Sequence, residues 1–324
     1  MLAEVMEEAS AGDPMSHVKW SRKSARRISE ALKRRKTPAS HSSVVRKLKR
    51  AGYSLRANRK RLSLRQSPDR DQQFRHIDRM KRRFIRRRLP IISVDAKKRE
   101  LVGPFKNAGR VWRRAPEDVS TYDFPSQADG VAIPYGVYDV GRDEGFVVVG
   151  TSRNTPGFAV SAIRQWWRDI GRKQYRSAQE LLILADAGGS NGTRAKAWRR
   201  ELGRFATDYG LRIRVAHYPT GASKWNPVEH RLFSAISINW AGTPLRDYET
   251  ICGYIRNTQT ASGTRCRVRT DTRYWPKSNE RRALRGRAAQ HDRYEPTVRP
   301  AHLLKHWNYA VVPSSSPSES FKLL

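Results

Sequence analysis

The chain has few cysteines, few acidic residues and no long apolar run. Two cysteines in 324 residues exclude a disulfide framework and a four-cysteine metal site. No apolar stretch approaches the ~20 residues that a membrane-spanning helix needs, and the acidic first 13 residues lack the basic start of a signal peptide. We therefore expect a protein of the reducing cytoplasm without a membrane partner.

Acidic residues are scarce relative to basic ones. The chain has 65 Lys and Arg against 30 Asp and Glu, a formal net charge of +35. Charge of this size indicates a polyanionic partner, and nucleic acid is the leading candidate. Between Lys19 and Arg88 lie 27 Lys and Arg but four acids, so the first third is a candidate DNA-binding region. A disordered basic tail is the alternative interpretation.

The first third carries helical periodicity as well as charge. Apolar spacing predicts one helix over Lys19–Lys36 and a second that begins near Ser40 and ends at Gly52. This pattern is typical of a helix-turn-helix, whose second helix enters the major groove, although any small helical hairpin looks similar. Its polar residues would meet base edges and its basic residues phosphates. The predicted DNA contacts are His41, Ser42, Ser43, Arg46, Lys47, Lys49 and Arg50.

The sequence divides into five parts that differ in charge and in predicted secondary structure. Residues 1–15 form an acidic N-terminal tail, and 16–55 form the helix-turn-helix region. Residues 56–89 form a basic helical connector, which either follows a DNA backbone or is a solvated linker. Residues 90–260 alternate strand-like and helix-like blocks, and 261–324 form a basic C-terminal extension that is partly irregular.

The central part has the order three strands, helix, strand, helix, strand, helix. Leu89–Val94, Val131–Val140 and Gly145–Gly150 are the first three strands, and Leu181–Ala185 is the fourth. Arg99–Val102 is expected to pair with the first strand across a turn. This order predicts an α/β domain with a mixed sheet and flanking helices, as in the ribonuclease-H-like fold.

Three acidic residues occupy positions that fit a shared site. Asp95 ends the first strand and Asp186 the fourth, and these strands are neighbours in the predicted sheet. Glu229 lies in the first turn of a helix predicted over Pro227–Trp240, on the face that packs against the sheet, where an acid is costly without a partner. Taken singly, each has an ordinary explanation: a turn or cap for the aspartates, and complementation of the helix dipole for the glutamate.

Taken together, the three acids indicate metal-dependent phosphoryl transfer. Neighbouring carboxylates repel one another unless a divalent cation lies between them, and Mg²⁺ prefers such oxygen ligands. Two ions about 3.5–4 Å apart activate the attacking oxygen and stabilise the leaving one. We expect Asp95 to bridge both ions, Asp186 to hold one and Glu229 the other, so that the catalytic residues are also the metal ligands.

Basic and aromatic residues flank the acids. Lys97 and Lys98 directly follow Asp95, and either hold a phosphate or form an exposed turn. Trp225 either stacks on a base freed from its duplex or packs in the core. His217 and His230 flank the acids; His230 is a candidate for orienting a water, but a packed or surface histidine is the favoured interpretation. The predicted DNA contacts near the acids are Lys97, Lys98, Lys224, Trp225 and Asn226.

Four segments around these acids carry a family resemblance. Segments 91–112, 132–140, 181–198 and 217–240 are similar to the "Rhodopirellula transposase" DDE family of bacterial insertion sequences. The similarity extends from roughly Gly12 to Tyr309. It implies a ribonuclease-H-like core, an acidic triad that binds two Mg²⁺ or Mn²⁺ ions, and DNA transposition.

The family motifs fall on the same three acids. They are Asp95 in VDAKK, Asp186 in ADAGGSN and Glu229 in VEHRLF. The chain departs from the family at Ala187, where glycine is usual, and in the very basic stretch Arg265–Arg299, which matches poorly. Many members also carry more sequence before the helix-turn-helix, so a missing N-terminal portion is expected.

Three functions stay open on the sequence alone. The first is a transposase that cuts element ends and joins the 3′-hydroxyl to target DNA. The second is a ribonuclease-H-like nuclease, which would not need the basic front. The third is a catalytically decayed DNA-binding protein or repressor of the element. For the first we expect double-stranded DNA of the terminal repeats and target as partner, a dimer or higher assembly on that DNA by family analogy, and a place with the nucleoid in the cytoplasm.

Overall fold

The protein divides into two compact units, each with its own apolar core. The computed structural model describes residues 24–54, 67–193, 195–222, 225–259, 263, 266–277 and 294–314, and the backbone of two strands at 10–12 and 19–21. The first unit is Met1–Leu62 and the second is Ser63–Leu324. No helix in the described ranges is long and apolar enough to cross a membrane.

The first unit contains a short helical pair. Helix α2 (Ala25–Arg34) begins where the Ser24 side chain accepts from Arg27 N, and α3 (His41–Arg50) begins where Ser40 accepts from Ser43 N. Ile28, Leu32 and Val44 form the core between them, and α3 is followed by Gly52 at φ +80°. The two helices and the start and end expected for the second are therefore confirmed.

The start predicted for the first helix was wrong. Residues Lys19–Ser21 form strand β2, which pairs antiparallel with β1 (Ser10–Gly12), and the helix begins only after the cap at Ser24. A serine side chain that caps a helix ends the helical pattern on its N-terminal side. Apart from the backbone of β1, the acidic tail 1–15 lies outside the described residues.

Helix α4 (Arg70–Arg86) is part of the second unit's core and not a separate connector. Ile77 and Phe84 are buried in the cluster that includes Ile91 of the sheet. Buried Gln73 donates to the His217 carbonyl at 2.8 Å, and it exchanges amide hydrogen bonds with Asn308 at 2.9 and 2.7 Å. The apolar stripe of this basic helix is a packing face, which corrects the connector expected over 56–89; residues 55–66 lie outside the described ranges.

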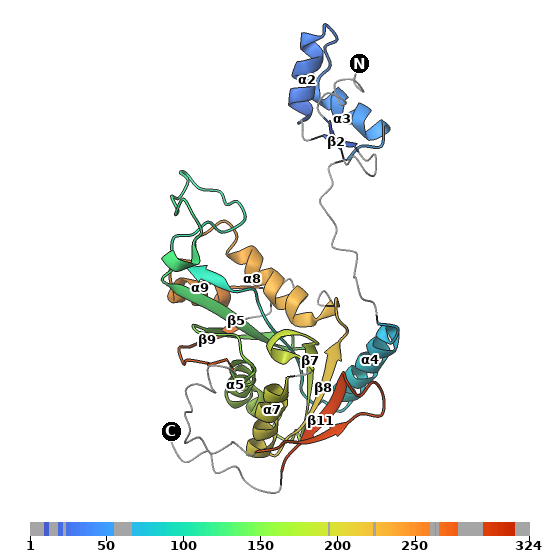
Figure 1. Ribbon diagram of the computed structural model, residues 1–324, viewed down its shortest axis with the longest axis vertical. Coiled ribbons are helices and arrows are strands. Elements are labelled where there is room, and N and C mark those ends of the chain that lie inside the picture. Colours follow the sequence, from blue (N-terminus) through green and yellow to red (C-terminus); the bar gives the residue numbers. More distant parts are fainter. Residues whose placement is uncertain are drawn as a thin grey trace. The chain divides into compact units, whose positions relative to one another are not determined.

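The second unit is built on a mixed sheet with helices on both faces (Figure 1). The strand order is β10-β11-β8-β7-β3-β5-β6-β9, with β4 paired to β5. Strands β3, β7 and β8 run parallel, and β5 is antiparallel to both its neighbours. The predicted mixed sheet is confirmed, as is the adjacency of the first and fourth strands. The strands are β3 (Ile91–Ala96), β4 (Glu100–Val102), β5 (Gly130–Asp139), β6 (Glu144–Gly150), β7 (Glu180–Asp186), β8 (Arg212–Tyr218), β9 (Cys266–Asp271), β10 (Thr297–Pro300) and β11 (Asn308–Val312).

Two expectations about strand pairing were wrong. Strand β4 pairs with the first half of β5, because β5 is long enough to accept β4 and β3 one after the other. The region 261–324, expected to be a partly irregular extension, contributes β9 beside β6, and β10 and β11 beside β8. These strands complete the two edges of the sheet, where unpaired backbone groups would otherwise be left.

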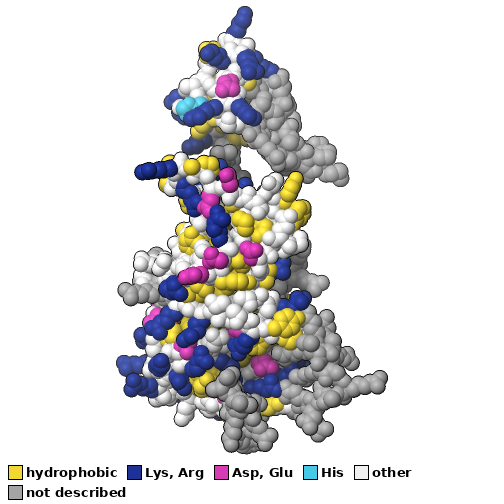
Figure 2. All heavy atoms as spheres, turned by 90° about the vertical axis from the view of Figure 1, so that its left-hand side faces the viewer, with side chains coloured by type: hydrophobic (Ala, Val, Ile, Leu, Met, Phe, Trp, Pro, Cys, Tyr) yellow, Lys and Arg dark blue, Asp and Glu magenta, His cyan; other side chains and the backbone are white. Residues whose placement is uncertain are grey.

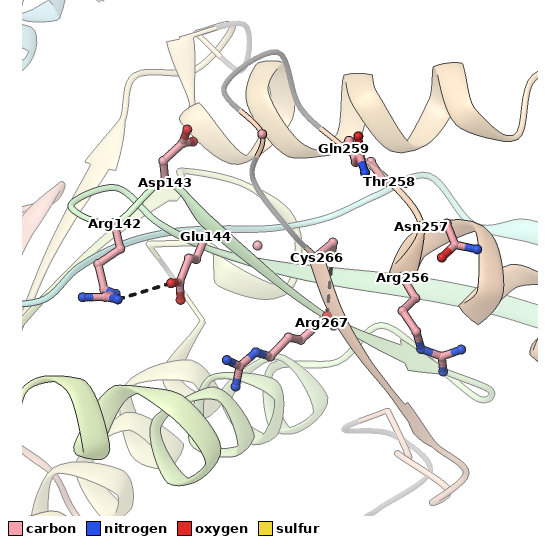
Figure 3. Close-up of a pocket in the computed structure, with 11 residues that line it drawn as sticks. Arg142, Asp143, Glu144, Arg256, Asn257, Thr258, Gln259, Cys266 and Arg267 are labelled. Carbon is pink, nitrogen blue, oxygen red and sulfur yellow. Dashed lines mark hydrogen bonds and ion pairs between the residues drawn. The ribbon is translucent and has the colours of Figure 1, made fainter.

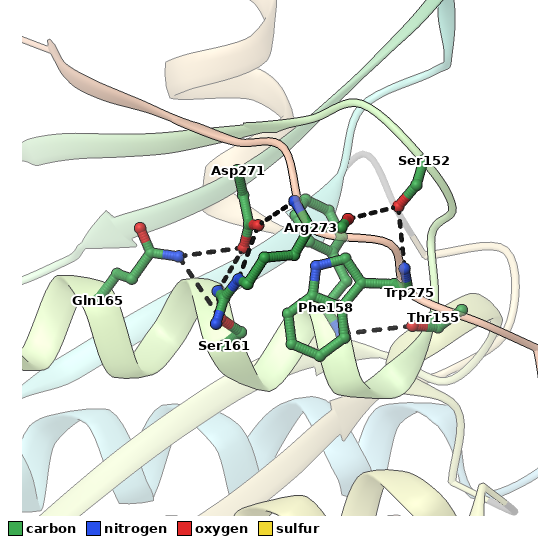
Figure 4. A network of polar contacts seen from close by, with 8 residues as sticks. All are labelled: Ser152, Thr155, Phe158, Ser161, Gln165, Asp271, Arg273 and Trp275. Carbon is green, nitrogen blue, oxygen red and sulfur yellow. Dashed lines mark hydrogen bonds and ion pairs between the residues drawn. The ribbon is translucent and has the colours of Figure 1, made fainter. Parts of the chain in front are cut away.

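A polar network fixes the end of β9 to the helical layer (Figure 4). Buried Asp271 accepts from the Arg273 guanidinium at 2.6 and 2.9 Å, and the same guanidinium donates to Ser161 at 2.7 Å. Ser152 donates to the Arg273 carbonyl at 2.9 Å and accepts from Trp275 N at 3.1 Å. The bidentate pair orients the Arg273 guanidinium toward Ser161, and the bonds to Ser161 and Ser152 tie the segment after β9 to α5 and to the loop before it.

The helices cover the two faces of the sheet separately (Figure 1). On one face pack α5 (Pro156–Trp166) and α7 (Lys196–Tyr209). Helix α5 continues through the π-helical η2 (Trp167–Gly171) into α6 (Arg172–Gln174), and the short 3₁₀ turns are η1 (Pro125–Gln127) and η3 (Gly189–Asn191). On the other face lie α4, η5 (Val228–Phe233), α8 (Ser234–Asn239) and α9 (Tyr248–Arg256).

Candidate active site

Asp95 and Asp186 lie side by side at the carboxyl ends of two parallel strands. Val94 of β3 is paired with Ala185 of β7, so the next residue of each strand is one of the aspartates. Each carboxylate accepts from the backbone amide that follows it, Asp95 from Ala96 and Asp186 from Ala187, both at 2.7 Å. The two side chains are therefore held in the same way beyond the strand ends, as the sequence predicted.

Glu229 reaches this pair from a helix on one face of the sheet. The helix predicted over Pro227–Trp240 forms, but its first part, η5, is π-helical, and the Ser234 hydroxyl donates to the Glu229 carbonyl at 3.0 Å. Leu232 and Trp240 of the expected face are buried. Glu229 itself is only half-buried, and its charge lies near enough to Asp95 to raise the pKa of that carboxyl. Single π turns in helices are frequent at functional sites.

A buried serine that was not among the predicted site residues ties this helix to strand β3. Ser93 lies two residues before Asp95; its hydroxyl donates to Asn226 Oδ1 at 2.5 Å and accepts from Val228 N at 3.0 Å. Asn226 is fully buried, so the prediction that it contacts DNA was wrong: its amide is used inside the protein. The one available signal was a serine in an otherwise apolar strand, IISVD.

Ser93→Ala should lower the free energy of unfolding by about 1–3 kcal/mol. The substitution leaves the Asn226 side-chain oxygen and the Val228 amide buried without their partner, and unmade buried hydrogen bonds carry a cost of this size. Urea unfolding followed by circular dichroism measures the loss. Ser126→Ala, at an exposed serine, is the matched control and should change stability by less than about 0.5 kcal/mol. Equal stability of both variants would contradict the assignment.

The site carries an excess of negative charge. Burial and, to a smaller extent, the charges of Glu229 and Asp186 together raise the pKa of Asp95 to about 7, against the Ala96 hydrogen bond, which lowers it. Burial also raises the pKa of Asp186 and that of Glu229. The nearby Lys97 lowers the pKa of Glu229, but its ammonium is 2.7 Å from Glu100. Three carboxyls therefore resist ionising together.

The donor chemistry of the site fits a hard divalent cation. All three acids supply oxygen, and Glu229 and Asp186 both raise the pKa of Asp95, a repulsion that a shared proton or a cation would relieve. Behind Asp95, the Tyr135 hydroxyl donates to Asn191 at 2.8 Å, and the buried amide nitrogen of Asn191 has no partner among the described residues. In the described part of the chain no three acid, histidine or cysteine side chains could hold a metal as they stand, so the carboxyls must converge to bind one.

The two lysines that follow Asp95 differ in environment. The Lys97 ammonium is paired with Glu100 and lies 4.5 Å from the centroid of the Trp240 ring. It is therefore engaged inside the protein, which does not fit its predicted phosphate contact. Lys98 is exposed and stays a candidate for that contact.

Trp225 and His217 resolve two alternatives that the sequence left open. The Trp225 side chain is 53% exposed and meets Phe74 edge-on, so it is not a core residue. His217 is fully buried, with Nδ1 at 3.0 Å from the Asp186 carbonyl, and burial lowers its pKa to about 4. It is a packed neutral histidine that supports the end of β7. Lys224 lies outside the described residues.

The predicted contacts of the first unit lie along α3. Ser43 is half-buried, and its hydroxyl is engaged by Ser40 and by Arg46, so it is less available than its neighbours. The exposed members of the set are His41, Ser42, Arg46, Lys47, Lys49 and Arg50. These side chains form a basic, solvent-facing surface on a single helix.

A cavity of about 910 Å³ lies at another part of the second unit, between the β5–β6 turn, the end of α9 and the start of β9 (Figure 3). Arg142 and Glu144 form an ion pair of 3.4 Å on one side, and Arg256 and Arg267 lie on the other. None of the three acids lines it, so its size does not make it the reaction site. On the face shown in Figure 2, most charged side chains are Lys or Arg, in keeping with the net charge.

Comparisons with known proteins identify the family of the chain. The model of the family described as "Rhodopirellula transposase DDE domain" matches residues 1–313. No curated protein matches the chain. The Mos1 transposase paired-end complex with the left transposon end is similar at 13% identity and a TM-score of 0.44, over 79% of this chain and 69% of that one. The Mos1 mariner paired-end complex with Mn is similar at 17% identity and a TM-score of 0.43, over 79% and 70%.

Proposed function

Because the chain belongs to the Rhodopirellula transposase DDE family, and is therefore a DNA transposase, we propose that Asp95, Asp186 and Glu229 are its catalytic triad. The observation that carries the proposal is their placement: two aspartates end adjacent parallel strands, and the glutamate on the covering helix is close enough for its charge to raise the pKa of Asp95. The strand order and the place of the acids at the carboxyl edge support a ribonuclease-H-like description of the sheet.

DDE transposases use divalent metal ions, and the three carboxyls are the ligands we propose for two of them. The charges of Glu229 and Asp186 both act on Asp95, so Asp95 would contribute to both ions, while Asp186 and Glu229 would each hold one. The ions supply activation of the attacking oxygen and stabilisation of the leaving oxygen in phosphodiester cleavage. Mg²⁺ or Mn²⁺ fits an all-oxygen donor set.

The protein's own groups hold the acids in place for this reaction. The Ala96 and Ala187 amides orient the two aspartates, and Ser93 holds the helix of Glu229 against β3. This support limits side-chain reorganisation when the phosphodiester arrives, which is how a preorganised site lowers a barrier.

DNA recognition is assigned to the first unit and to the rim of the site. We propose that α3 reads a terminal repeat from the major groove, with its exposed lysines and arginines on phosphates. Trp225, which is 53% exposed and precedes Glu229 by four residues, would stack on a terminal base. Two element ends must be joined in one reaction, so a dimer or higher assembly on chromosomal DNA in the cytoplasm is part of the proposal.

The triad proposal is tested by calorimetric titration of the protein with Mn²⁺. Wild type should bind two ions, and Glu229→Gln should weaken the binding of one of them at least about tenfold, because a neutral amide replaces an anionic ligand. Glu249→Gln, at an exposed glutamate of α9, is the charge-matched control and should bind like wild type. Unchanged binding by Glu229→Gln would remove Glu229 from the site.

A further inference from the structure

A groove in the second unit gathers arginines from three separate elements. It has a volume of about 650 Å³ and lies between α4, β8 and the β10–β11 edge. Figure 1 shows α4 beside β8 and β11. Six arginines and two histidines line it, and none of its described lining residues is Asp or Glu. The basic residues are His76, Arg79, Arg83, Arg86, Arg212, Arg214, Arg299 and His302.

The arginines are arranged in rows. Arg79, Arg83 and Arg86 recur at intervals of four and three along α4, so they share one side of the helix. Arg212 and Arg214 alternate on β8 and point to one face. Nearby, Glu180 pairs with Arg214 at 2.6 Å and with Arg87 at 3.4 Å. One carboxylate does not balance this concentration of positive charge, and like charges held together destabilise a fold unless an anion joins them.

We propose that this groove binds the phosphodiester backbone of duplex DNA; the inference rests on the proposed function and names a second DNA contact for it. The row from Arg79 to Arg86 is about 10 Å long at 1.5 Å per residue. A DNA strand places one phosphate per about 3.4 Å of axis. The row of arginines is therefore long enough to contact several successive phosphates of one strand, and it is longer than a site for a single phosphate needs to be. Guanidinium groups also match phosphate oxygens bidentately.

The lining favours duplex over single-stranded DNA. Single strands are bound by exposed aromatic rings on which bases stack. Among the described lining residues, Tyr309 is the one member of the Phe, Tyr and Trp group, and it is buried. Contacts to phosphates alone carry no sequence information, so the groove adds affinity for any duplex.

The groove lies away from the reacting bond. Arg214 is paired with Leu182, four residues before Asp186 on β7, which is roughly 13 Å along the strand at about 3.3 Å per residue. A duplex held there is gripped beside the cleavage point and not at it. The groove therefore positions DNA that flanks the bond to be cut.

The test is a salt titration of DNA binding by the full chain, with a labelled duplex of arbitrary sequence and fluorescence anisotropy. Arg79→Gln/Arg212→Gln removes one charge from each wall at exposed positions. Affinity near 0.1 M salt should fall at least about fivefold, and the slope of log K against log salt should flatten by roughly 2, since each phosphate contact contributes about 0.9. Arg79→Lys/Arg212→Lys keeps the charge and should keep most of the slope.

The matched control is Arg172→Gln/Arg176→Gln, which removes two exposed charges that do not line the groove. Equal weakening by both pairs would overturn the proposal, because net charge alone would explain it. Binding of DNA by Arg79→Gln/Arg212→Gln as tight as that of wild type would also overturn the proposal. If this variant lost binding to poly-glutamate but kept binding to DNA, the groove would be assigned to an acidic protein partner. The assay measures DNA binding and needs no cleavage. Failure of the triad assignment would therefore leave the groove proposal intact, and failure of the groove proposal would leave the triad assignment intact.

Discussion

Asp186→Asn should slow DNA strand cleavage about a thousandfold while leaving DNA affinity nearly unchanged. The substitution keeps the size of the side chain and its hydrogen bond from the Ala187 amide. It removes one negatively charged oxygen that would bind the metal ion. Losing a preorganised electrostatic contact to the transition state costs 10²–10³ in rate, and a weakened ion adds to this. The measurement is single-turnover cleavage of a duplex that carries an element end, with Mg²⁺, beside anisotropy on the same duplex.

Asp118→Asn is the control for this experiment. Asp118 is an exposed aspartate of the same unit, and its substitution makes the same change in net charge. Cleavage by this variant should match wild type. Cleavage retained by Asp186→Asn would refute the triad, whereas loss of both cleavage and DNA binding would indicate misfolding and would be recognised by circular dichroism.

Asp95→Asn should make the metal-free protein more stable at neutral pH by about 2 kcal/mol. Burial and the neighbouring acids raise the Asp95 pKa from 3.8 to about 7 in the folded state. Between these values the folded chain keeps a proton that the unfolded chain releases, so stability falls as pH rises from about 4 to 7 and then levels off. Each pKa unit corresponds to about 1.4 kcal/mol of stability. Rearrangement of the neighbouring acids reduces the total loss of stability to about 2 kcal/mol. Asparagine carries no charge at any pH and escapes this loss.

Thermal unfolding at pH 5 and pH 8 in a chelating buffer measures the difference. The variant should exceed wild type at pH 8, and the gap should shrink at pH 5. Mg²⁺ at pH 8 should then raise the melting temperature of wild type more than that of the variant, since the cation offsets the same repulsion. A variant less stable than wild type at pH 8 without metal would refute an electrostatic cost at Asp95.

The acidic site could be predicted because each part of it is local in sequence. Asp95 and Asp186 end short apolar strands, and Glu229 stands in the first turn of a well-marked helix. The parallel pairing that joins the first two follows from general rules of strand order. The support by Ser93 could not be predicted, because its partners lie 133 and 135 residues away.

The edges of the sheet and the role of α4 were hidden for different reasons. Strands β9 and β10 carry arginines on their exposed sides, which gives their segments the composition of a solvated tail. Helix α4 is so rich in basic residues that its few buried positions, among them Ile77 and Phe84, look like a weak stripe. In both cases the residues are buried by a strand that is distant in sequence. The apolar pattern of a short sequence window does not show such burial.

The hydrogen bonds between Gln73 and Asn308 have a consequence for shortened gene copies. They join two residues 235 positions apart, one on α4 and one at the start of β11. A reading frame that stops before Asn308 loses β11, which leaves the edge of β8 open and the buried Gln73 side-chain oxygen without its Asn308 donor. Such a copy is expected to make a second unit that unfolds or aggregates, even though Asp95, Asp186 and Glu229 are all still encoded. Nonsense mutations near the end of the gene should therefore silence the element as effectively as a lost aspartate.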